Sequence, residues 1–130
     1  GSTRIGSSVA ASTSQIYNDP VSLTGSVVLG GSGSLILNAV NGGANNLTLS
    51  VGGDATLLGS IGDSNTLTID GGGKTIIGAS GGSGSIAITS TGSQTIADNL
   101  EIREDTILSG VPVTLLGTKT VDSGKTLSTP

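Results

Sequence analysis

Two similar stretches, NLTLSVGGDATLLG at residues 46–59 and TLTIDGGGKTIIG at residues 66–78, decide the fold of this chain. In each, apolar residues alternate with polar ones, a glycine-rich turn follows, and a Thr-aliphatic segment leads to another glycine. Alternation with a period of two buries one face of a β-strand, and glycine supplies positive-φ turns at low steric cost. Each stretch therefore predicts two short strands joined by a turn.

Related units recur at residues 85–97, 100–110 and 113–121, with a spacing of about 19 to 20 residues in the regular part. A short strand pair cannot bury its apolar face alone, whereas stacked pairs build one continuous core. We therefore expect an all-β chain folded as a parallel β-solenoid of about seven coils. The expected coils begin at Val21, Leu35, Leu47, Leu67, Ile86, Leu100 and Val113.

The irregular coil lengths argue against a three-sided left-handed hexapeptide helix and favour the right-handed form. The alternative fold is an antiparallel β-sandwich or jelly roll, because closely spaced short strands fit that architecture too.

The composition excludes most catalytic chemistry. The chain has no His, Cys, Met, Phe or Trp, and its only aromatic residue is Tyr17. No imidazole or thiol can serve as base, nucleophile or soft metal ligand, so catalytic triads, zinc sites and haem sites are excluded. Paired carboxylates remain, but carbohydrate-cleaving sites normally include aromatic side chains that stack on sugars. We therefore expect a protein that is not an enzyme.

The charge balance argues against nucleic acid as a partner. Five basic residues face nine acidic ones, which gives a net charge of −4. No basic cluster or set of aromatic residues is present to bind phosphates or stack on bases. No apolar run approaches the roughly 20 residues of a membrane span.

The chain divides into an N-terminal segment, residues 1–12, and a single solenoid domain, residues 13–130. The segment is expected to be flexible or to pair with a partner edge, and Tyr17 is a candidate cap for the open end of the core. A solenoid without capping elements leaves unpaired strand edges at both ends. The expected partners are therefore copies of the chain or flanking repeats of a longer parent chain.

The acidic residues mostly occupy turn positions, where Asp bonds its own backbone. Stacked turns could bring Asp54 and Asp70 together, or place Asp105 beside Glu104, close enough for Ca²⁺ with backbone carbonyls. These are weak calcium candidates, and no other cofactor is expected. Asn46, in the sequence Asn-Leu-Thr, is a candidate glycosylation site.

A column of outward threonines is predicted on the second strand of the units. An outward threonine column is ordinary for a solvated β-face, and an ice-binding face would require a flat and regular Thr-x-Thr array. The residues that precede these threonines are too mixed for such an array. The expected column consists of Thr56, Thr75, Thr95, Thr106 and Thr120.

The unit TLTIDGGGKTIIG, the motif Ser-Gln-x-x-x-Asp at residues 93–98 and the segment EDTILSG at residues 104–110 resemble a known group. They are similar to filamentous-haemagglutinin-type repeats of large secreted bacterial adhesins, and to autotransporter passenger repeats. The resemblance covers roughly residues 13–121 and rests on a degenerate pattern. It implies a right-handed β-helix, secretion, and a stalk or scaffold role at the cell surface, with no catalytic residue.

Two functions follow as expectations. The first is a non-enzymatic structural segment of an extracellular surface adhesin, whose parent chain binds glycans or proteins of a host or of another cell surface. The alternative is a subunit of a self-assembling extracellular filament, joined by end-to-end β-stacking or donor-strand pairing.

Overall fold

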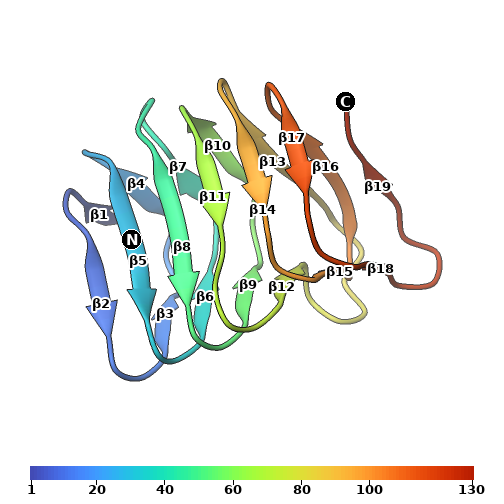
Figure 1. Cartoon of the computed structure of the whole chain (residues 1–130), viewed down its shortest axis with the longest axis horizontal. Coiled ribbons are helices and arrows are strands. Elements are labelled where there is room, and N and C mark those ends of the chain that lie inside the picture. The colour runs from blue at the N-terminus through green and yellow to red at the C-terminus, as the bar shows by residue number, and fades with distance from the viewer.

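The computed structural model describes all 130 residues as a coil of about six turns, with three short strands in each turn and no helix (Figure 1). Each strand pairs with the strand in the same position of the next turn, which generates three sheets along the axis. We call them sheets A, B and C, in the order in which the chain enters them.

Sheet A consists of β1 (Thr3–Ile5), β4 (Val21–Leu23), β7 (Val40–Asn41), β10 (Ile61–Ser64), β13 (Ser85–Ser90), β16 (Asp105–Ser109) and β19 (Leu127–Ser128). Sheet B consists of β2 (Val9–Ala11), β5 (Val27–Gly31), β8 (Leu47–Val51), β11 (Leu67–Ile69), β14 (Gln94–Ile96) and β17 (Val113–Leu115). Sheet C consists of β3 (Gln15–Tyr17), β6 (Leu35–Leu37), β9 (Ala55–Leu57), β12 (Thr75–Ile77), β15 (Leu100–Ile102) and β18 (Lys119–Val121).

All pairings are parallel, which confirms the solenoid and excludes the antiparallel sandwich. In Figure 1 the sheet B strands run downward on the near side while the chain advances from left to right, so the coil is right-handed. This is the usual hand for a crossover between parallel strands. Six turns at a spacing of ~4.8 Å make a rod roughly 30 Å long.

The coil count differs from the expected seven because each turn has three faces. Leu35 and Leu100 do not begin turns of their own. Both lie in sheet C, in one column that runs from Leu35 through Ala55 and Thr75 to Leu100. The irregular coil lengths that argued against a three-sided helix come from corners of different length, and the coil is three-sided.

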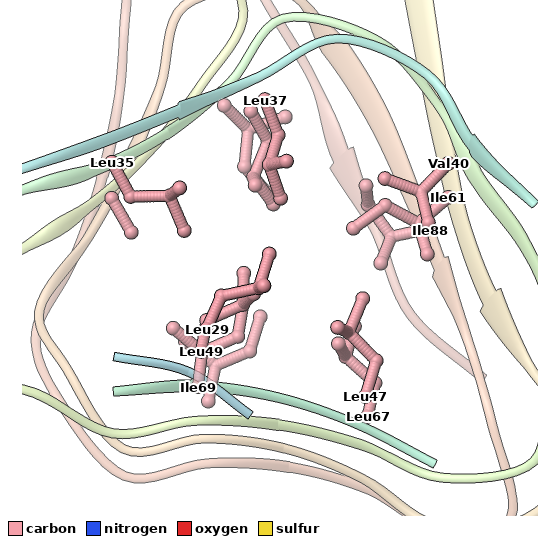
Figure 2. Packing of buried hydrophobic residues seen from close by; sticks show 14 of the residues in the cluster. Leu29, Leu35, Leu37, Val40, Leu47, Leu49, Ile61, Leu67, Ile69 and Ile88 are labelled. Atoms are coloured by element: carbon pink, nitrogen blue, oxygen red, sulfur yellow. The ribbon is translucent and has the colours of Figure 1, made fainter. Parts of the chain in front are cut away.

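The core is a bundle of aliphatic columns inside the three sheets. Figure 2 shows Leu29, Leu49 and Ile69 stacked in one column, with Leu47 and Leu67 in the next. The main cluster contains 23 buried residues, all Val, Leu or Ile except Ala55. Each fully buried Leu, Ile or Val stabilises the fold by about 1.5–3 kcal/mol. A narrow coil is therefore filled without aromatic side chains.

The N-terminal segment belongs to the coil. Within residues 1–12, β1 pairs with β4 and β2 pairs with β5, and the Ile5 side chain is buried. Three-residue strands in a glycine- and serine-rich segment give a weak sequence signal, and here pairing with the next turn of the coil holds them.

Glycine is required where corners of successive turns stack. Gly31 has φ +136°, and a Cβ built on it would lie 1.9 Å from the Ala11 carbonyl oxygen. Any larger residue at this position would push two turns apart.

Candidate functional site

The calcium candidates lie in three different environments. Asp54 is half-buried in the corner between sheets B and C, and its Oδ1 accepts a hydrogen bond from the Lys74 N–H at 3.1 Å. The residue that stacks on Asp54 in the next turn of the coil is thus Lys74 and not Asp70. Asp70 is exposed, immediately after β11. Asp105 is exposed at the start of β16, where Oδ1 accepts hydrogen bonds from the backbone and hydroxyl of Thr126. No group of three or more His, Cys, Asp or Glu side chains is placed to hold a metal ion.

The predicted threonine column does not exist as one column. Thr56 and Thr120 point outward on sheet C, whereas Thr95 points outward on sheet B. Thr75 and Thr106 face the core and are only 0% and 1% exposed. The prediction was wrong because a two-strand unit was aligned along a coil of three strands, so successive units fell on different faces.

The in-register threonine column lies on sheet B. Thr48 pairs with Thr68, Thr68 with Thr95, and Thr95 with Thr114. Val28 continues the column one turn earlier. All four threonines are half-buried and face outward.

The glycosylation candidate Asn46 is exposed immediately before β8. Its Oδ1 accepts a hydrogen bond at 2.8 Å from Nδ2 of Asn65, which lies in the next turn of the coil. The side chain therefore takes part in an exposed asparagine pair between turns.

Two buried carboxylates hold the backbone where the coil is irregular, and sequence analysis assigned neither of them this role. Asp98 accepts hydrogen bonds from the Gly71 N–H at 2.9 Å and from the Thr75 hydroxyl at 3.4 Å. Glu104 accepts hydrogen bonds from the N–H groups of Ala79 at 2.8 Å and Gly84 at 3.0 Å.

Each carboxylate marks a change in corner length. The B–C corner places six residue steps between Ile69 and Thr75 but only four between the paired Ile96 and Leu100, and Asp98 lies in this shorter corner. Glu104 holds the loop of residues 78–84, which connects β12 in sheet C to β13 in sheet A, through its bonds to Ala79 and Gly84. Lys125 also donates a hydrogen bond to the Gly82 carbonyl oxygen in this loop, at 2.7 Å. The two acids are thus structural groups.

The outer face of sheet C carries the ion pairs of the molecule. Glu101 accepts from Lys74 Nζ at 2.7 Å and from Arg103 Nε at 3.1 Å. These hydrogen bonds, from Lys74 first and Arg103 second, hold the pKa of the Glu101 carboxyl below its ordinary value. A shallow polar hollow of about 420 Å³ adjoins them, lined by Lys74, Asn99, Leu100, Glu101, Thr118 and Thr120.

Glu101→Gln is expected to lower the free energy of unfolding at pH 7 by about 1 kcal/mol or less, because the pairs are solvent-exposed. A lowered folded-state pKa stabilises the fold above the unfolded-state pKa, and this contribution is lost as pH falls through the folded value. The difference from wild type should therefore shrink below about pH 4. Urea unfolding at pH 7 and pH 3.5 measures this difference in the free energy of unfolding.

Asp122→Asn, which removes a carboxylate without an ion pair, is the control. An undiminished Glu101→Gln effect at pH 3.5 would contradict the assignment of the ion pairs.

The two ends of the coil are chemically different. At the N-terminal end the Tyr17 hydroxyl donates to Gln15 Oε1 at 2.9 Å, and Gln15 Nε2 donates to the Gly30 carbonyl oxygen at 2.6 Å. Tyr17 packs against the core, and burial raises the pKa of its phenol. Tyr17 and Gln15 are thus linked to each other and, through the Gly30 carbonyl oxygen, to the second turn.

At the C-terminal end the core stays open. Sheet A has seven strands and sheets B and C have six, so β19 lies one turn beyond the last strands of sheets B and C. Beside the β17 edge lies an open hollow of about 580 Å³, lined by Gly110, Val111, Pro112, Val113, Leu115, Thr129 and Pro130. Because β17 is the edge strand of sheet B, this apolar hollow suits a further strand laid parallel to it.

Comparison with known proteins finds no family model, curated protein or solved structure that matches this chain. The structure also contains no helix long and apolar enough to cross a membrane.

Proposed function

We propose that this chain is a non-enzymatic structural segment, a stalk or scaffold, of a large extracellular surface adhesin. The observation that supports it is the coaxial stack of parallel turns with unpaired strand edges at both ends. Each added turn extends such a rod by ~4.8 Å and buries its apolar face against the last one. Each added turn therefore lengthens the rod and extends the same core, so a spacer of any length can be built from one kind of unit.

The similarity of the repeats to filamentous-haemagglutinin-type and autotransporter passenger repeats supports the extracellular location and the stalk role. In this proposal the partners of the two edges are flanking solenoid turns of the parent chain. Adhesion itself, to glycans or proteins of another cell surface, belongs to other parts of that chain.

Antibodies against the chain test the location. They should label intact cells that produce the parent protein, without permeabilisation. Labelling that appears only after permeabilisation would overturn the extracellular assignment.

A second candidate is a subunit of an extracellular filament, favoured by the apolar hollow beside β17. Sedimentation and negative-stain microscopy of the purified chain, with and without Ca²⁺, separate the two. The stalk proposal predicts a short monomeric rod under both conditions. Ordered fibres with a fixed axial repeat would replace it with the filament.

A further inference from the structure

The outer face of sheet B carries two columns of small polar side chains in strict register. The sheet B strands from β5 to β17 lie side by side on the near face in Figure 1. The residues just before β5, β8, β11 and β14 form one column, and the second residue of each strand from β5 to β17 forms the other. We call these residues the threonine array: Ser26, Asn46, Thr66 and Ser93 in one column, and Val28, Thr48, Thr68, Thr95 and Thr114 in the other.

The regular part of the array is its central column, which has one β-branched residue per turn, Val28 and then four threonines. Only Thr66 and Thr68 form a Thr-x-Thr row, and the other residues of the neighbouring column are Ser or Asn. Successive turns repeat at ~4.8 Å along the axis, and alternate residues of one strand lie about 7 Å apart across it. The backbone hydrogen bond from the Val27 N–H to the Asn46 carbonyl, and the same bond from Leu47 to Thr66, hold adjacent rows in alignment. Thr and Val are β-branched and have few rotamers, so their methyl groups are held in place.

The threonine hydroxyls of the array are free for an external partner, whereas Ser26 Oγ accepts a hydrogen bond from the Asn46 N–H at 3.0 Å. Thr48, Thr66, Thr68, Thr95 and Thr114 form no side-chain hydrogen bond within the protein, although all are half-buried. Some threonines elsewhere do form them: the buried hydroxyl of Thr106 donates to the Glu104 carbonyl oxygen at 2.8 Å. Thr56 and Thr120 on the outer face of sheet C do not, but Ile76 and Glu101 separate them in their column. An unbroken column of unpartnered threonine hydroxyls therefore belongs to sheet B.

The chemistry of the array restricts the classes of partner that can bind to it. None of its residues is charged, and the nearest acid along the strands, Asp70, lies at the margin after β11. Protein and glycan partners are usually held through pockets, aromatic anchors or charges, and the array has none of these. A hydroxyl both donates and accepts, as water does. The partner that fits is a periodic, uncharged hydrogen-bonding solid.

We propose that the threonine array binds ice. Its axial repeat is close to the repeat of hexagonal ice along its a axis, so ordered water between the methyl groups and on the hydroxyls can join the crystal surface. The binding uses sheet B alone and is independent of the proposed stalk role, which depends on the two ends of the coil.

The test measures how much of the full chain enters a slowly growing ice hemisphere relative to the remaining liquid. Wild type should be enriched several-fold in the ice. Thr68→Lys and Thr95→Lys, which place a charged chain in the middle of the array, should lose that enrichment. Thr56→Lys makes the same change at the central outward position of sheet C and should behave as wild type.

Circular dichroism of each variant checks that the coil is intact. A Thr68→Val variant keeps the methyl groups and should retain part of the enrichment, which guards against an effect of lysine on folding. Exclusion of the wild type from ice would overturn the proposal, as would equal enrichment of wild type and Thr68→Lys. Binding to crystalline cellulose without enrichment in ice would assign the array to a carbohydrate lattice instead.

Discussion

Replacing Ile88 with aspartate is expected to abolish the cooperative fold. Ile88 is 0% exposed in the sheet A column between Ile61 and Leu108. The substitution removes about 1.5–3 kcal/mol of burial and adds the cost of an unpaired buried charge, several kcal/mol. The total approaches the 5–15 kcal/mol that stabilises an ordinary domain. Thermal melting followed by circular dichroism should show no cooperative transition above room temperature.

Ile107→Asp is the matched control for this effect. Ile107 lies on the adjacent strand β16, but its side chain points outward and is 54% exposed. The same change there should alter the melting temperature only slightly. An unchanged melting curve for Ile88→Asp would contradict the register of sheet A.

Asp98→Ala is expected to give the second large effect, about 2–4 kcal/mol in the free energy of unfolding. The substitution leaves the fully buried Thr75 hydroxyl without its acceptor, which costs about 1–3 kcal/mol. It also removes the hydrogen bond from the partly buried Gly71 N–H, which contributes about 1 kcal/mol more. For a domain of this size the melting temperature should fall by about 10 °C. Urea unfolding measures the free energy directly.

Two further variants isolate the role of the Asp98 carboxylate. Asp98→Asn keeps an oxygen that can accept from Gly71 and should lose less stability than Asp98→Ala. Asp70→Ala removes an exposed Asp near the same corner, one turn earlier, and should have little effect. Equal losses for Asp98→Ala and Asp70→Ala would show that Asp98 does not hold the shortened corner.

The sequence predicted many strands of sheets B and C because most of their inward positions are apolar, as in Leu47 to Leu49 and Leu67 to Ile69. Sheet A was predicted only in part: the strands that contain Val21 and Ile86 were recognised, whereas β7 and β10 were missed because they are short or polar. β7 contains only Val40 and Asn41, and β10 reads Ile-Gly-Asp-Ser from Ile61 to Ser64. The stacked turns support these strands through their neighbours, which local pattern does not reveal.

Because the third face of the coil was not predicted, the outward threonines were also assigned wrongly. With only two faces assigned, threonines from three sheets were placed in one column, and the Thr48 to Thr114 column was not recognised. The roles of Asp98 and Glu104 depend on corner length, which is defined only once the register of each turn is known. An acid between two strands indicates an ordinary turn, so the sequence context of Asp98 and Glu104 gave no reason to assign them a special role.

Paired cysteines test the central claim, a three-sided coil in the register described here. The chain has no native Cys, so engineered pairs are unambiguous. Thr48→Cys with Thr68→Cys occupies paired positions about 4.8 Å apart, inside the range that a disulfide spans. Thr56→Cys with Thr75→Cys puts one thiol outside sheet C and the other in the core. Mild oxidation should close the first pair quantitatively and leave the second reduced, whereas oxidation of the second pair and not the first would contradict the account.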